Sequence, residues 1–249
     1  MSNHSLPAGV WRREAMAEIT RSKRLPQFLV PTVLTPAAFF ALFALALNKS
    51  SPEAATVMLA GYGVFAATGP ALFGFGAGVA MEREQGLIEL KRVSPLPAGA
   101  YVAAKLAAAL FATGLAMILI DATALVADVR LSLLGWAELT AISLVSTLPY
   151  ALLGFGLGMR MTGKGAVAAA NALYLGSAIL GGLWIPSAML PGWMRMLGQL
   201  MPSYHLNQLA QAVVNPAQSG ASPSHAAIVA GMTAVAGFWA WSGWRRSAA

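Results

Sequence analysis

Residues 106–127 read LAAALFATGLAMILIDATALVA, and Asp121 is the one charged side chain in this stretch. At about 1.5 Å per residue, a helix of this length crosses the roughly 30 Å hydrocarbon core of a bilayer. Lipid offers no partners to backbone N–H and C=O groups, so a spanning segment forms these hydrogen bonds within a helix or a closed barrel. The stretch therefore predicts a membrane-spanning helix.

Five further apolar stretches surround it, at about residues 28–47, 54–81, 136–159, 166–184 and 226–244. Of the 249 residues 57% are hydrophobic and 10% charged, against about 25% charged in a soluble domain. The chain has no cysteine, which excludes disulfides and thiolate metal sites. We therefore predict an all-α integral membrane protein with six transmembrane helices.

The N-terminal part of the chain differs from the rest. Residues 9–24 predict an amphipathic helix, in which Trp11, Ala15 and Ile19 recur every four residues among basic side chains. Such a helix lies in the headgroup plane of a membrane; the alternative is a solvated basic tail. We expect a cytoplasmic tail with this interfacial helix over residues 1–25, followed by a six-span membrane domain over 26–249.

The basic residues predict the orientation. With the N-terminus in the cytoplasm, the outer side carries only Lys49, Arg130 and Arg195, and Lys105 lies at an inner boundary. The other twelve of the 16 lie inside: Arg12, Arg13, Arg21, Lys23, Arg24, Arg83, Lys91, Arg92, Arg160, Lys164, Arg245 and Arg246. Cytoplasmic loops carry such an excess of Lys and Arg. This bias predicts a multi-pass protein of the bacterial plasma (inner) membrane with both termini cytoplasmic, and it explains the net charge of +7 without nucleic acid.

Two connections between the apolar stretches are unusual. The inner one contains MEREQGLIELKRVSPLP at residues 81–97. The outer one, residues 185–225, is too apolar for a simple loop and contains IP at 185–186, LPGW at 190–193 and LMPSY at 200–204. Its segments 189–200 and 205–214 predict short helices, separated by Pro202, that are re-entrant or interfacial because they are too short to cross.

Both motifs resemble those of type-2 ABC transporter (ABC-2) permeases. The inner run is similar to the family's cytoplasmic loop, E-R-E-x-G-T-[LI]-E-x-L, with Leu87 where threonine is common, and Lys105 matches a basic residue at the start of the following helix. The outer run is similar to the family's F-P, L-P-x-W and P-x-[TS]-Y elements. The matching residues are Pro186, Pro191, Trp193, Pro202 and Tyr204.

The resemblance implies an exporter built from two permease chains, identical or different, and two cytoplasmic ABC ATP-binding subunits. The N-terminal helix would be the elbow helix, and residues 82–92 the coupling helix that docks on the ATPase. The candidate docking residues are Glu82, Arg83, Glu84, Gln85, Gly86, Leu87 and Glu89. ATP and magnesium would bind the partner subunit, so we expect no cofactor, metal or catalytic residue in this chain.

Polar residues within the spans are candidates for function. Asp121 and Glu138 lie near the outer ends of neighbouring spans, and an intramembrane ionisable group marks a functional site by default. The alternative is that both reach the outer interface or pair with Arg130. Asn171, in the fifth span, is a candidate for an interhelical hydrogen bond. The small residues Gly74/Gly78 and Gly154/Gly158 are spaced for close helix packing.

A secondary transporter or channel, and a polytopic membrane enzyme, are the other classes considered. Residues 158–165 imitate a P-loop but have Gly165 where a magnesium-binding hydroxyl is needed. His4, His205 and His225 lack metal-ligand spacing. The predicted path lacks midplane charges, which favours an amphipathic or hydrophobic cargo, such as a drug or lipid, moved out of the cytoplasm.

Overall fold

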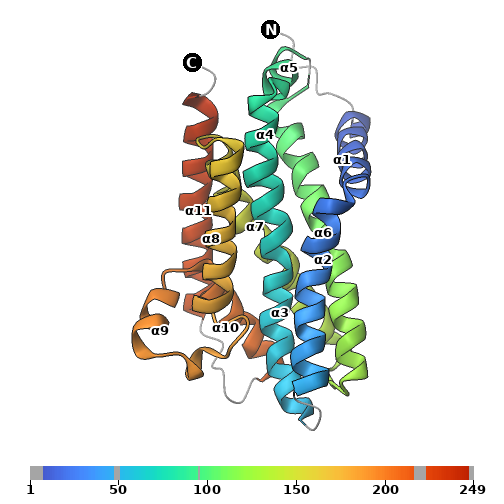
Figure 1. Ribbon diagram of the computed structural model, residues 1–249, viewed down its shortest axis with the longest axis vertical. Helices are drawn as coiled ribbons and strands as arrows, with labels where there is room; N and C mark the ends of the chain where they lie inside the picture. Colours follow the sequence, from blue (N-terminus) through green and yellow to red (C-terminus); the bar gives the residue numbers. More distant parts are fainter. Residues whose placement is uncertain (1–7, 48–50, 95, 216–222, 247–249) are drawn as a thin grey trace.

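The computed structural model of the chain describes residues 8–47, 51–94, 96–215 and 223–246, and every regular element in these ranges is helical. Five helices are long and apolar enough to cross a membrane: Pro26–Ala46, Pro52–Glu84, Gly99–Val126, Leu133–Gly158 and Pro223–Arg246. They run along the long axis of the molecule (Figure 1). The predictions of an all-helical fold and of a multi-pass membrane protein are confirmed.

The second span lies at the centre of the bundle. It consists of α3 (Pro52–Leu72), a π-helical turn η2 (Phe73–Ala77) and α4 (Gly78–Glu84). Its apolar window is 78% buried inside the chain, compared with 22–56% for the other four. Pro70 lies just before η2 and has no N–H to donate, which weakens the α-helical hydrogen bonding there. The first span also ends in a π-helical turn, where α2 (Pro26–Ala41) continues into η1 (Leu42–Leu47).

Glycines bring the fourth span, α7 (Leu133–Gly158), against this centre. A Cβ atom on Gly158 would lie 2.7 Å from the carbonyl oxygen of Phe75, which is closer than real Cβ contacts. The pair Gly154/Gly158 therefore permits close packing, as predicted. The pair Gly74/Gly78 does not, because Cβ atoms there would meet their nearest neighbours at 3.9 and 3.6 Å, an ordinary contact distance.

The predicted fifth span, α8 (Gly163–Leu180), is not among the five helices that are long and apolar enough to cross a membrane. It has 18 residues, or about 27 Å at 1.5 Å per residue, and it contains the polar residues Lys164 and Asn171. It packs against α3, η2 and α7 and runs along the bundle like the spans (Figure 1). The six-span count therefore stays a prediction.

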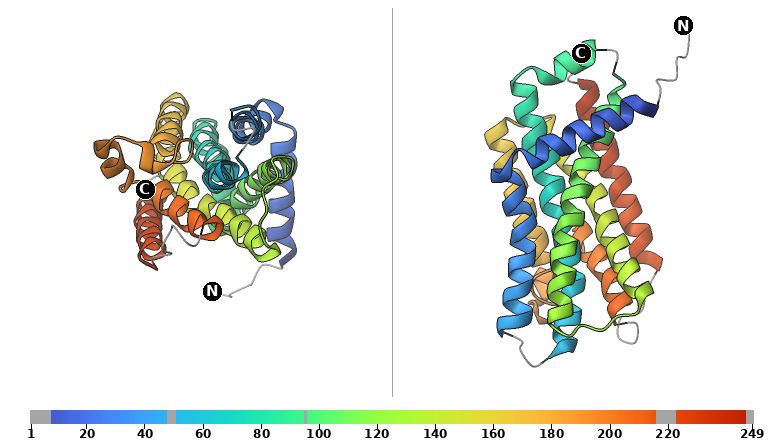
Figure 2. Two further views of the ribbon diagram at one scale, coloured as in Figure 1. Left: turned by 90° about the horizontal axis from the view of Figure 1, so that it is seen from below. Right: turned by 90° about the vertical axis from the view of Figure 1, so that its right-hand side faces the viewer.

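The remaining helices gather at the two ends of the bundle (Figure 1). At one, the α5 end, lie α1 (Ala8–Lys23), α5 (Leu87–Val93), the start of α6 (Ala98–Val126) and the last turns of α11 (Pro223–Arg246). Helix α1 lies across the long axis (Figure 2). At the other, the α9 end, lie η3 (Ser187–Met189), α9 (Gly192–Gly198) and α10 (Pro202–Val214).

One boundary prediction at the α9 end is wrong. Pro202 does not separate two helices but is the first residue of α10, a position where the missing N–H costs nothing and the fixed φ suits the helix. The predicted pair of short helices is otherwise present. Lys49, Pro95 and His4 lie outside the described residues.

Candidate functional site: the coupling hairpin and its ionic ladder

The inner motif folds into a helical hairpin. Helix α4 ends at Glu84, and α5 begins at Leu87 after a tight turn. Gly86 in this turn has φ +72°, a left-handed conformation that glycine adopts without the steric cost of a Cβ. The glycine of the motif therefore reverses the chain at the end of the central span, so that α5 folds back beside α4.

Helix α1 is bound to this hairpin by a row of ion pairs that we call the ionic ladder. Glu14, Glu18 and Arg21 are four and three residues apart and so share one face of α1. Each pairs with a different element. Lys91 Nζ of α5 lies 3.3 Å from Glu14, Lys105 Nζ of α6 lies 2.8 Å from Glu18, and Arg21 pairs with Glu82 of α4.

Glu82 is the centre of the ladder. It is 3% exposed and accepts hydrogen bonds from Arg21, from Lys105 Nζ at 2.9 Å and from the Tyr101 hydroxyl at 2.6 Å. A buried carboxylate needs such partners, because desolvation of an unpaired ion costs several kcal/mol. Burial alone would lower the pKa of Arg21, but the hydrogen bond to Glu82 and the charges of Glu82 and Glu18 together raise it.

The next two residues of the motif bind the turn between α7 and α8. The Arg83 guanidinium donates to the carbonyl oxygens of Met159 and Met161, the latter at 2.7 Å. Glu84 Oε1 accepts from the backbone N–H of Gly163 at 2.9 Å, at the first residue of α8, where a helix carries unpaired N–H groups. The Glu82–Glu84 triplet thus connects the central span to α1, α6 and the start of α8.

The surface left for a partner is smaller than the sequence predicted. Of the seven candidate docking residues, Glu82 is buried and Arg83 is bound within the chain, whereas Glu84, Gln85 and Glu89 are exposed. The hairpin also exposes two apolar residues that were not in the candidate set, Leu90 at 64% and Val93 at 85%. Ile88, 1% exposed, holds α5 onto the core.

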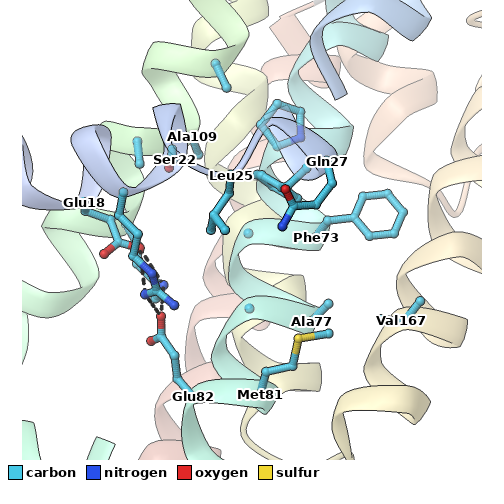
Figure 3. A pocket seen from close by; sticks show the side chains of 18 of the residues that line it. Glu18, Ser22, Leu25, Gln27, Phe73, Ala77, Met81, Glu82, Ala109 and Val167 are labelled. Atoms are coloured by element: carbon cyan, nitrogen blue, oxygen red, sulfur yellow. Dashed lines mark hydrogen bonds and ion pairs between the residues drawn. The ribbon is translucent and has the colours of Figure 1, made fainter. Parts of the chain in front are cut away.

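A cavity of about 460 Å³ lies beside the ladder, below the junction of α1 and α2 (Figure 3). One end is polar and contains Glu18, Arg21, Glu82 and Lys105. The remainder is mainly apolar and is lined by residues including Leu25, Phe28, Phe73, Ala77, Met81 and Val167. Sequence reasoning missed this cavity, because its walls come from α1, α2, η2, α4, α6 and α8. The local spacing of Glu14, Glu18 and Arg21 was the available signal for a charged face on α1.

The predicted intramembrane polar residues do not form a site together. Asp121 has a buried Oδ1 without a hydrogen-bond partner among the described residues, whereas Glu138 is exposed. The alternative pairing with Arg130 is wrong, because Arg130 pairs with Asp128 at 3.1 Å on the surface. Asn171 donates to the carbonyl oxygen of Val167 at 3.0 Å, so its hydrogen bond is within α8 and not between helices.

The outer motif positions the short helices of the α9 end. Pro191 precedes α9, and Pro186 precedes the short turn η3. Trp193 is 64% exposed, as expected of an interfacial ring, and Tyr204 packs edge-on against His205 at 5.2 Å between ring centroids. The motif thus sets where the helices begin, and its aromatic residues lie on the surface and beside a histidine pair.

The helical bundle, the hairpin and the order of the two motifs define a permease. A family model for the ABC-2 type transporter matches residues 11–214, and the chain belongs to this family. Members of the family have no nucleotide site of their own, and the ATPase resides in a partner subunit. The chain is similar to the Bacillus subtilis (strain 168) protein named "Putative transport permease YvfS", with 28% identity over 220 residues that cover 86% of this chain and 88% of that protein.

Proposed function

We propose that this permease is the pathway subunit of an ATP-driven exporter, with α5 as the surface that docks on the ATP-binding subunit. The exposed apolar pair Leu90 and Val93, beside the charge of Glu89, carries the proposal. The basic residues of the α5 end argue for a cytoplasmic location of this end. A group of exposed apolar side chains marks an interaction site, and neighbouring charges set the register of docking.

The ionic ladder supports a mechanism of coupling. A push on α5 moves α4, which is one continuous helix with the central span. Because Glu82, Arg83 and Glu84 bind α1, α6 and the α7–α8 turn, these elements move with it. We propose that closure of the ATPase dimer is transmitted in this way as a rigid-body movement between two permease chains.

The cavity supports an amphipathic or hydrophobic cargo. Its volume of about 460 Å³ lies within the range of roughly 300–1,000 Å³ typical of small-molecule sites. Its walls are mainly apolar, and its charges lie at one end, which suits a molecule with one polar and one apolar part.

Gly74→Leu would fill part of this cavity. ATP-driven uptake of a fluorescent amphiphile into inverted vesicles should fall with Gly74→Leu but not with Gly114→Leu, since a Cβ at Gly114 meets open space.

Docking is tested by purifying the permease together with its ABC ATP-binding subunit. The variant Leu90→Glu/Val93→Glu should lose copurification and lower transport-linked ATP hydrolysis more than about tenfold, while still inserting into the membrane. Leu133→Glu, which alters an 88% exposed apolar residue at the α9 end, is the matched control and should behave as wild type. Normal copurification of the double variant would refute the docking surface.

Two alternative classes of membrane protein, a secondary transporter or channel and a membrane enzyme, would give different results in the copurification and transport assays. Either would act without the ATP-binding protein. Transport that persists after removal of ATP would favour the first, and turnover of a membrane substrate without transport would favour the second.

A further inference from the structure

Two histidines from different helices are in direct contact at the α9 end. His205 of α10 and His225 of α11 lie with their Nδ1 atoms 2.8 Å apart. His205 is 5% exposed, and His225 is partly exposed. The Nε2 atom of His205 lies 2.9 Å from the backbone carbonyl oxygen of Gln199.

The carbonyl partner determines the tautomers of both rings. A carbonyl oxygen only accepts, so Nε2 of His205 carries the proton and donates to Gln199. In a neutral imidazole the other nitrogen is then an acceptor, so Nδ1 of His205 accepts. Nδ1 of His225 must therefore be protonated and donate.

This arrangement limits the number of protons that the pair holds. His225 can gain a proton on its Nε2 atom without changing the hydrogen bond, because its Nδ1 already donates. A further proton could go only to Nδ1 of His205, where it would face the Nδ1–H of His225 and break the bond. The intact pair thus accepts one added proton and is opened by a second.

In the part of the chain that the structure describes, the residues around the two rings form no ion pair with either histidine. Tyr204 packs on both rings, with centroid distances of 5.2 and 6.1 Å. Tyr150 of α7 lies near Ser203 on the neighbouring turn of α10. Among the described residues neither histidine forms an ion pair with the charged groups of this end and its neighbouring helices, which are Glu53, Asp121, Asp128, Arg130, Glu138 and Arg195.

The two rings are placed for a proton rather than a metal ion. Two histidine nitrogens on one zinc ion, at about 2.0–2.1 Å each in tetrahedral geometry, lie roughly 3.3 Å apart. The observed 2.8 Å is a hydrogen-bond distance. Within the described residues no group of three His, Cys, Asp or Glu side chains could complete a metal site.

Other hydrogen bonds show which helix the pair holds in place. Helix α10 is fixed to the core by Asn207 Nδ2, which donates to Gly182 O at 2.9 Å, and by Gln211 Nε2, which donates to Val57 O at 2.8 Å. Helix α11 has the least buried window of the five spans, 22%. Loss of the histidine contact therefore weakens the attachment of the first turn of α11 to α10 and leaves α10 in place.

We propose that His205 and His225 form a proton-binding site, in which uptake of the second proton releases the first turn of α11 from α10. The location of the α9 end on the outer side of the membrane rests on the proposed function, whereas the binding of protons does not. The site makes the attachment of the last span sensitive to acid.

The tautomers are tested by nitrogen NMR of the detergent-solubilised permease labelled with 15N-histidine. The chain has three histidines, so the spectrum is simple. At pH 8 we expect one ring protonated on Nε2 and another on Nδ1, with a mutual coupling across the hydrogen bond that is lost on acidification. Independent titration of all rings as Nε2–H tautomers would overturn the proposal.

The release of α11 is tested by thermal unfolding at pH 8 and pH 5.5, since histidines generally change charge near pH 6.5. The melting temperature of the wild type should fall by about 2–4 °C at the lower pH. His225→Gln should abolish this fall, because an amide can turn to offer either a donor or an acceptor. His4→Ala should retain it. An equal fall in His225→Gln and the wild type contradicts the proposal, whatever ATPase the chain binds.

Discussion

The two ends of the bundle attach their peripheral helices by different chemistry. At the α5 end, helix α1 is held by charged side chains, with Glu82 and Lys105 almost fully buried. At the α9 end, α10 and α11 are held by neutral amides and imidazoles. Separating a buried ion pair leaves an uncompensated charge, whereas separating a neutral hydrogen bond leaves only an unpaired polar group at a smaller cost. The α5 end is therefore suited to move as one body and the α9 end to separate locally.

The largest effect is expected from breaking the centre of the ladder. Glu82→Gln leaves Arg21 and Lys105 without their shared carboxylate, and removal of one partner from a buried ion pair costs about 3–5 kcal/mol. The double variant Glu82→Gln/Lys105→Met should recover more than half of this loss, because no excess buried charge remains. Thermal unfolding in detergent measures both. Equal destabilisation in the single and double variants would show that packing, not charge, connects these helices.

A smaller effect is expected at the α9 end. Asn207 is 3% exposed and donates to the carbonyl oxygens of Gly181 and Gly182. Asn207→Ala leaves these neutral acceptors unpaired, at a cost of about 1–3 kcal/mol in the free energy of unfolding. Gln208→Ala, one residue further along α10, is the control and should change stability by less than about 0.5 kcal/mol. If Asn207→Ala destabilised as much as Glu82→Gln, the contrast between the two ends would fail.

The smallest effect is expected at the edge of the ladder. The Glu14–Lys91 pair is about one-third exposed on both sides and has a distance of 3.3 Å. Such pairs contribute about 0–1 kcal/mol and are screened by salt. Glu14→Gln should therefore change the unfolding temperature slightly in low salt and not at all in 1 M salt. A salt-independent loss would indicate that Glu14 acts through packing.

Local patterns in the sequence predicted most of the fold. Long apolar stretches predicted the spans, because a bilayer imposes length and composition on each helix separately. The inner motif was predicted as one coupling helix over residues 82–92, and this is wrong, because the chain reverses at Gly86 and only Leu87–Val93 forms α5. The exception was α8, in which Lys164 and Asn171 lower the hydropathy and leave the length close to the minimum.

The candidate site was less predictable, because its contacts join distant parts of the chain. Arg21 and Glu82 are 61 residues apart, and Glu18 and Lys105 are 87 apart. The predicted stripe of Trp11, Ala15 and Ile19 described the apolar residues of α1 but not the charged row that binds the protein. No periodicity indicates which buried partner a charge will meet, so Glu82 was predicted to face a docking subunit when it lies inside the chain.

The π-helical turn η2 has a consequence for the length of the central span. A π turn accommodates one residue more than the α-helix around it. Deleting one residue from Phe73–Ala77 would convert the π turn to regular α-helix and leave the flanking helices near their present orientation. Deleting one residue from the regular helix of α3 would instead rotate everything beyond it by about 100°, since 3.6 residues complete a turn. In the second case Glu82 would point away from α1 and α6. A one-residue deletion in Phe73–Ala77 should therefore be better tolerated than a one-residue deletion in the regular helix of α3.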